Sequence, residues 1–363
     1  MIKMLIMKKI FELMYWYYNH GKREIMTEKN FTDNCFDLLR IIAAVMVMLS
    51  HSFRHFNIVK PKWLFFLCDG SIGVIIFFTI SGFLVMSSYE RCLFKGESVW
   101  HFWWKRIIRI YPGFLLCFLF VSILNLMEGI NIFQISYFKY FATDWLYPRG
   151  GAFGNGYSNG VFWTLKCELI FYFLVPFIYK CMKKMSMIKN ICLIVAFWIF
   201  ACFDAQIIEM MHQYRYIRLF FKDSSIEFFM YEFLLGSFFY FYRNKFLCSL
   251  PSKRMLFSYG TLWFIWYCIN RYINILPRIG MMHNVFVSIA TPSLVIGMAY
   301  GFGKIRFNYD ISYGIFLYHM PIIYVFLKMG FDNISGMICV WPVVILMAFC
   351  STILEKKAIK YLA

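Results

Sequence analysis

The sequence predicts an all-α membrane protein, a bundle of about ten transmembrane helices. Three observations predict this class. Hydrophobic residues make up 61% of the 363 residues and charged residues only 15%, too few to coat a water-soluble globule. Many apolar runs approach the roughly 20 residues that cross a bilayer. The lysines and arginines gather on alternate connections between these runs.

Ten apolar segments are predicted to span the lipid bilayer. In chain order they are Phe36–Phe56, Ser71–Tyr89, Ile110–Met127, Val161–Cys181, Ile188–Phe203, Ile226–Tyr242, Met255–Ile275, Asn284–Tyr300, Ile311–Phe326 and Gly336–Leu354. The fifth is short for a membrane-crossing helix.

The net charge of +18 follows the predicted topology and does not indicate nucleic-acid binding. With the N-terminus placed in the cytoplasm, about 24 of the 37 lysines and arginines lie on the cytoplasmic side and about 11 outside. Both termini are therefore expected in the cytoplasm. A nucleic-acid partner would need a soluble basic face, which the sequence does not offer.

Residues 1–30 are predicted as an N-terminal cytoplasmic extension ahead of a membrane domain at residues 31–363. Basic residues surround an aromatic-rich run in Met1–Ile25. This stretch is either a basic helix on the membrane surface or sequence upstream of a true start at Met26. No small-residue cleavage site follows it, which argues against a signal peptide.

The cysteine and histidine spacings fit no metal site.

The first span places Asp37, Arg40 and His51 on one helix face. His51 follows Arg40 by eleven residues, which at 100° each make three turns plus about 20°. Asp37 and Arg40 can pair, and His51 is expected about 16 Å beyond Arg40. Charged groups are costly in hydrocarbon and are functional candidates there. Singly, Arg40 could reach the interface and His51 could be structural, but a shared stripe favours a site.

The second and ninth spans add polar groups near the middle of the membrane. Ser81 stands beside Gly82, a combination typical of close helix packing and interhelical hydrogen bonds. In the ninth span, Pro321 follows His319 by two residues and frees a backbone carbonyl nearby. For Ser81 and His319 alike, a purely structural role competes with a role in an active cavity.

Lys105, Arg106 and Arg109 precede the third span in a segment interpreted as a cytoplasmic loop, with Tyr111 close behind. The general excess of positive charge on the cytoplasmic side explains such a cluster. Arg106 and Arg109 are also three residues apart and share a helix face. That arrangement suits a phosphate-bearing ligand that approaches from the cytosol.

The fourth span contributes Glu168, about 9 Å below the outer surface by helical rise and hence near the expected depth of His51. A carboxylate at that depth could orient the imidazole or stabilise an imidazolium. The alternative is a structural ion pair of Glu168 with Lys166 or Arg54. The Gly-, Asn- and Ser-rich segment before this span is expected to be either an external access route for an acceptor or a plain re-entrant connector.

Five motifs in register resemble one family. They are Arg40 and His51 for an Arg, ten residues, His element, Phe77–Val85 for FFxxSGF, Arg106–Pro112 for RxxR-Y-P, Trp163–Tyr172 for W-[ST]-L-x-x-E-x-x-FY, and Ser312–Pro321 for SYxxYLxH-x-P, with Phe316 where Tyr is usual. From Phe36 to about Glu355 the chain is similar to the acyltransferase 3 family of integral membrane O-acyltransferases, which are largely bacterial.

The resemblance implies ten membrane helices in the bacterial inner membrane and an acyl donor such as acetyl-CoA bound from the cytosol. It also implies transfer to a hydroxyl of a glycan or lipid-linked saccharide at the other face. His51 would be the essential histidine, Arg40 its motif partner, and Arg106 and Arg109 donor-side residues. The SGNH domain of some relatives is not expected.

Together, these inferences give one hypothesis for the mechanism. His51, oriented by Glu168, acts as general base on the acceptor hydroxyl, and Ser81 steadies the oxyanion. A covalent acyl-histidine is the second route, and the sequence does not separate the two. The alternative function is a transporter or flippase for a glycan or lipid precursor, which buried ionisable residues suit equally well. Against it stands the absence of an internal repeat.

Overall fold

The fold is known from a computed structural model that describes residues 31–129, 131–133, 162–202, 226–247, 253–273 and 285–362. All regular structure in these ranges is helical, which confirms the predicted all-α class. The N-terminal extension with Met26 and the Gly-, Asn- and Ser-rich segment at 150–160 lie outside the described residues, so both interpretations stay predictions.

Each predicted span overlaps a helix in the part of the chain that the structure describes. The elements in chain order are α3 (Phe36–His55), η1 (Lys62–Leu64), α4 (Gly70–Phe94), α5 (Val99–Met127), α7 (Phe162–Lys184), α8 (Met187–Cys202), α11 (Ile226–Phe241), α12 (Arg243–Leu247), α13 (Lys253–Ile273), α14 (Val285–Gly301), α15 (Ser312–Lys328) and α16 (Ile334–Leu362).

Among the described residues, five helices are long and apolar enough to cross a membrane, namely α3, α4, α5, α7 and α16. Shorter apolar helices lie within α8, α11, α13 and α14. These helices support a multi-pass membrane protein. The count of ten crossings remains a prediction, because the shorter helices fall below the length that reaches across hydrocarbon without help.

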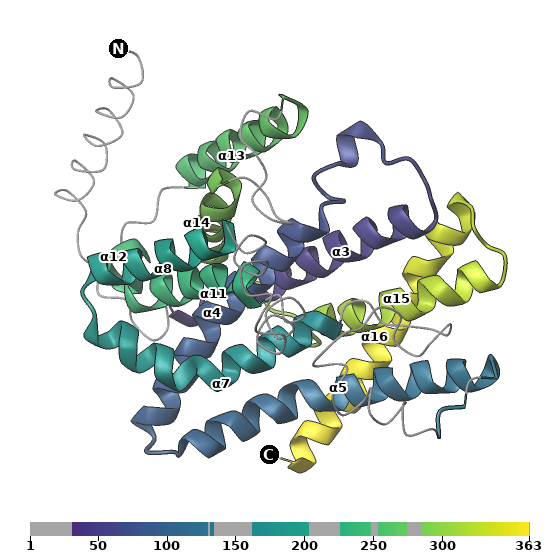
Figure 1. Ribbon diagram of the computed structural model, residues 1–363, viewed down its shortest axis with the longest axis horizontal. Helices are drawn as coiled ribbons and strands as arrows, with labels where there is room; N and C mark the ends of the chain where they lie inside the picture. Colours follow the sequence, from purple (N-terminus) through teal and green to yellow (C-terminus); the bar gives the residue numbers. More distant parts are fainter. Residues whose placement is uncertain are drawn as a thin grey trace, which may run out of the picture.

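Helix α4 lies at the centre of the bundle and packs against α3, α7, α11 and α14 (Figure 1). It runs antiparallel to α3, since Gly70 faces Ser50 while Gly73 faces the backbone of Ala43. On one side α15 packs against both α3 and α16, and α5 packs against α16 and α7. In Figure 1, α13 and α14 lie on the side of the bundle away from α5 and α16.

The close packing predicted at Gly82 is confirmed. A Cβ atom at Gly82 would lie 2.1 Å from the backbone oxygen of Phe233 in α11. Reciprocally, a Cβ at Gly236 of α11 would lie 2.1 Å from the backbone oxygen of Thr79 in α4. Only glycine lets the two backbones approach this closely.

The basic segment before the third span is helical, whereas a loop was expected. Helix α5 begins at Val99, and the Ser98 side chain accepts a hydrogen bond of 3.2 Å from the His101 backbone N–H. This cap, together with aromatic packing, extends the helix ahead of the predicted start at Ile110. Trp103 Nε1 donates to the Tyr172 carbonyl at 3.1 Å and ties this first part of α5 to α7.

Candidate active site

A cavity of about 450 Å³ lies between α3, α4, α5, α7, α15 and α16. It contains five predicted site residues, namely Arg40, Ser81, Lys105, Arg109 and Glu168. Its other polar lining residues are Thr164, Asp310, Ser312, Tyr313, Thr352, Glu355 and Lys356. The cavity thus gathers charged groups at the end of the bundle where α3, α5 and α15 begin and α16 ends.

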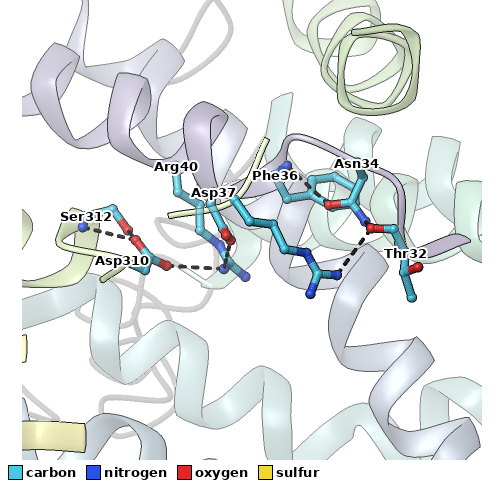
Figure 2. A network of polar contacts seen from close by, with 8 residues as sticks. Thr32, Asn34, Phe36, Asp37, Arg40, Asp310 and Ser312 are labelled. Carbon is cyan, nitrogen blue, oxygen red and sulfur yellow. Dashed lines mark hydrogen bonds and ion pairs between the residues drawn. The ribbon is translucent and has the colours of Figure 1, made fainter. Parts of the chain in front are cut away.

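Arg40 is held by two carboxylates on the cavity wall. Its Nη1 lies 3.4 Å from Asp310 Oδ2 and 3.8 Å from Asp37 Oδ1, which confirms the predicted pairing with Asp37 (Figure 2). The other Asp310 oxygen accepts hydrogen bonds from the Ser312 backbone N–H (3.1 Å) and hydroxyl (2.5 Å). Asp310 therefore couples the start of α15 to Arg40 of α3.

Asp310 was not among the predicted site residues. Its sequence signal is local, because an Asp that accepts from the backbone two residues on is a common turn before a helix. That local signal does not indicate that the second carboxylate oxygen of Asp310 contacts Arg40, which lies on a helix far earlier in the chain.

Arg109 and Arg106 have different surroundings, although they were predicted to act together. Arg109 lines the cavity and is exposed there, and no carboxylate of the described residues forms an ion pair with it. Arg106 is not on the cavity wall. Its Nη2 donates to Ser88 Oγ at 2.5 Å, and its guanidinium lies over the rings of Phe102 and Tyr172. Three residues turn a helix by 300°, which is 60° short of a full turn, so the Arg106 and Arg109 side chains leave the helix in directions 60° apart.

The other two predicted donor-side residues, Lys105 and Tyr111, also lie in different surroundings. Lys105 lines the cavity, and its Nζ lies 3.2 and 3.3 Å from the two oxygens of Glu97. Tyr111 is not part of the cavity lining, and its ring packs against Phe114 with centroids 5.9 Å apart. The structure thus places Lys105 and Arg109, but neither Arg106 nor Tyr111, at the cavity.

The expected partnership of Glu168 with His51 is wrong. Glu168 lines the cavity, accepts a hydrogen bond from the Tyr172 hydroxyl, and makes no ion pair with Lys166, Arg54 or any other described residue. The depth estimate assumed that its helix starts at the outer surface. Instead, the first ring of α7, Phe162, packs at 5.1 Å against Phe114 at the middle of α5.

Ser81 also lies away from His51. The neighbouring Phe83 ring packs against Phe36, the first residue of α3, so Ser81 sits at the opposite end of α3 from His51. An oxyanion role for Ser81 next to His51 is therefore not supported. Its hydroxyl oxygen is buried against the cavity without a hydrogen-bond partner among the described residues. It remains available to a bound molecule.

His51 pairs with His319, the ninth-span candidate. His51 Nδ1 lies 2.8 Å from His319 Nε2, and the rings are stacked at 5.1 Å. His319 is fully buried, and its Nδ1 lies 3.0 Å from the Ile315 carbonyl oxygen. Histidine, not a carboxylate, is thus the group that orients His51.

This arrangement fixes the tautomers of the two neutral rings. A carbonyl oxygen only accepts, so His319 Nδ1 carries the proton and His319 Nε2 is the acceptor. His51 Nδ1 must then donate, which leaves the lone pair on His51 Nε2. No described residue forms a hydrogen bond with that Nε2. A free lone pair on a half-buried imidazole is suited to take a proton or attack a carbonyl carbon.

The histidine pair adjoins the inner end of the cavity. Phe316 lines the cavity, and its ring lies 6.1 Å from that of His319. His51 itself is not part of the cavity lining. The charged cavity and the histidine pair are therefore neighbouring compartments.

No group of three or more histidine, cysteine or acidic side chains within the described ranges could hold a metal ion.

Comparisons with known proteins identify the family. The family model described as "Acyltransferase domain", Acyl_transf_3, matches residues 33–354, nearly the whole chain. The chain is 27% identical to Nodulation protein 10 of Rhizobium leguminosarum bv. viciae, over 90% of this chain and 93% of that protein. It is 41% identical to the O-acetyl transferase of Shigella phage Sf6 over 97 residues, 25% of this chain and 28% of that protein. No solved structure matches the chain.

The match runs from just before α3 to the last turns of α16 and so includes every helix that lines the cavity and both paired histidines. The chain therefore belongs to the acyltransferase 3 family and is an acyltransferase that transfers groups other than aminoacyl groups.

Proposed function

We propose that the protein is an O-acetyltransferase that moves an acetyl group from cytosolic acetyl-CoA to a hydroxyl of a cell-surface glycan or lipid-linked saccharide. The observation that carries the proposal is an arginine without an ion-pair partner in a cavity whose inner end adjoins a histidine pair. A guanidinium that faces a cavity and forms no ion pair there is suited to bind the phosphate of a ligand. An anionic donor supplies that phosphate.

The cavity has the volume of a small-molecule site, and its cations suit the phosphates of a CoA thioester. About 450 Å³ lies within the roughly 300–1,000 Å³ range of small-molecule sites. Lys105 and Lys356 are exposed on its lining, and Arg109 is exposed to its interior. These three cations would bind phosphates. The Ser81 hydroxyl, unpaired among the described residues, and the Glu168 carboxylate would bind the amides of the pantetheine arm.

His51 Nε2 would act at the thioester. As the acceptor oxygen attacks the thioester carbon, His51 takes the hydroxyl proton, the new C–O bond forms and the C–S bond breaks. The imidazolium then gives its proton to the departing thiolate, so the products are an ester and free CoA thiol. The hydrogen bond from His51 Nδ1 to His319 holds the His51 ring so that its Nε2 points away from His319 during both proton transfers.

In the covalent route, the same lone pair of His51 attacks the thioester first, and the acceptor hydroxyl then takes the acyl group from the imidazole. A burst of CoA thiol released before any acceptor is acylated would support this route, whereas strictly concurrent release supports direct transfer.

The location and the acyl group rest on separate support. Excess positive charge on alternate connections supports an inner-membrane protein with both termini and the cavity mouth facing the cytoplasm. The printed name of the Sf6 relative, O-acetyl transferase, supports acetyl as the group transferred.

Membranes that contain the protein, incubated with acetyl-CoA labelled in the acetyl group, test the proposal. We expect label to enter the saccharide fraction, and we expect His51→Ala to lower the rate about 100-fold or more, since general base catalysis contributes roughly 10²–10⁴-fold. His55→Ala is the matched control, one turn later on α3 with its ring 6.1 Å from that of His51. Full transfer by His51→Ala at equal expression would refute the mechanism.

A further inference from the structure

We propose that the rings of Phe77 and Phe316 close the inner end of the cavity and restrict the transferred acyl group to a short one. This inference rests on the proposed function, because it assigns a substrate class, short-chain acyl thioesters, to the same site. Phe77 and Phe316 come from different helices, α4 and α15, and both line the cavity.

The Phe316 ring contacts both Phe77 and the histidine pair. The ring centroids of Phe77 and Phe316 are 5.6 Å apart at an interplanar angle of 70°, an edge-to-face contact. On its other side the Phe316 ring lies 6.1 Å from His319, which in turn holds His51. In the proposed site, a thioester carbon reaches His51 from the cavity past the Phe77–Phe316 contact.

The cavity lining has an apolar part besides the charged one. Val74 and Phe78 lie within one turn of Phe77 on α4 and also line the cavity, as do Arg109 and two lysines of the charged part. The apolar wall suits the acyl end of a donor and the charged part suits its phosphates. The donor is thus oriented with its thioester toward the histidine pair.

The rings would limit acyl length by steric exclusion. Phe316 is buried, at 6% exposure, and packs against Phe77 on one side and His319 on the other, so a longer acyl chain has to displace a ring. In enzyme pockets of this kind one methylene changes turnover by roughly 10–200-fold. Acetyl is therefore expected to be strongly preferred over butyryl and hexanoyl groups.

Variants of both rings test the inference in membranes that contain the full chain. The probes are acetyl-, butyryl- and hexanoyl-CoA labelled in the acyl group, and the readout is the ratio of butyryl to acetyl transfer into the saccharide fraction. We expect Phe77→Ala and Phe316→Ala to raise this ratio at least about tenfold. Phe316→Tyr retains the ring and should retain the preference for acetyl.

Phe326→Ala is the matched control, because Phe326 lies on the same helix, packs against Phe331 and is not part of the cavity lining. Its ratio should equal that of the wild type. Where an alanine variant fails to accumulate, Phe77→Leu or Phe316→Leu decides by the same ratio. Unchanged ratios in variants that still transfer acetyl would overturn the inference alone. No transfer by the wild type from any of the three thioesters would overturn the proposed function itself.

Discussion

At the scale of single residues, the role of each arginine follows from its neighbours. Arg40 is bound by Asp37 and Asp310, Arg106 by Ser88, and Arg109 by no carboxylate of the described residues. Arg40 and Arg106 link helices through these partners, whereas the Arg109 guanidinium is exposed on the cavity wall, where an anionic ligand can bind it. Substitutions at these arginines are therefore expected to have different effects on activity and stability.

Arg109→Gln should raise the KM for acetyl-CoA about tenfold or more, because it removes a charge-assisted contact to the donor. Arg106→Gln, three residues earlier, should leave that KM within about twofold and instead reduce the amount of folded protein, since it removes the link to Ser88. Initial rates at varied acetyl-CoA concentration measure both effects. Equal KM values in the two variants would contradict the separation.

His319→Ala should lower kcat by about 10²-fold while leaving the KM for acetyl-CoA nearly unchanged, because His319 orients His51 without touching the donor. His319→Gln should recover part of the loss, since its side-chain carbonyl can accept the same hydrogen bond from His51 Nδ1. A purely structural role for His319 predicts no such rescue. Single-turnover rates of the two variants, compared at equal expression, decide between these roles.

Asp310 has two separable tasks, one for each carboxylate oxygen. Asp310→Asn should retain the turn at Ser312 but lose the charge that faces Arg40, whereas Asp310→Ala should lose both. We expect the alanine variant to melt at a lower temperature than the asparagine variant, by an amount equivalent to about 1 kcal/mol. Thermal unfolding in detergent measures the difference, and identical melting would contradict a role in the turn.

At the scale of helices, the contact between α4 and α11 depends on two glycines that interlock. Gly82 meets the backbone of Phe233, and Gly236 meets that of Thr79, so an added methyl group collides with backbone and not with a movable side chain. This contact fixes α4, and α4 contributes Ser81 and Phe77 to the cavity. Packing far from the histidines thus sets the shape of the site.

Gly82→Ala should destabilise the protein by about 1–3 kcal/mol or more, as overpacking of a tight contact does. Gly260→Ala makes the same change in α13, where the nearest heavy atom lies 3.7 Å away, and should be tolerated. The quantity to compare is the fraction of each variant that survives heating in detergent. Equal survival would show that the α4–α11 contact can relax.

Helix positions follow closely from the sequence, because apolar runs of spanning length have few other solutions in a membrane. Helix starts follow less well. Residues 99–109 of α5 carry basic side chains and looked like a loop, yet the Ser98 cap and the aromatic contacts of Trp103 make them helical. The start of α7 was placed at the outer surface, but its packing against Phe114 places it at the middle of α5.

At the scale of the whole molecule, the orientation in the membrane is the main prediction that the helices alone do not settle. The charge distribution predicts that both termini lie in the cytoplasm. A fluorescent reporter that matures only in the cytoplasm, fused after Ala363, should therefore fluoresce in membranes. A fusion protein that inserts into the membrane but does not fluoresce would show that the C-terminus lies outside. The predicted orientation would then be wrong, and the cavity mouth would face outward.

The site could be predicted in part, because motifs identify residue types but not their tertiary partners. Arg40 with Asp37 lies within one helix, so helical geometry was sufficient. His51 with His319 joins α3 to α15, and the sequence contains no signal for that pairing. Depth estimates favoured Glu168 because they measured distance along each helix and took every helix to start at the surface.

The Phe77–Phe316 contact also has an electrical consequence. A water-accessible cavity that enters a bilayer from one side shortens the insulating path, and one that continued to the other side would conduct protons and ions. In the proposed orientation, the two apolar rings would insulate the charged cavity from the histidine pair. The imidazole base could then lie within the membrane without opening a path for ions across it.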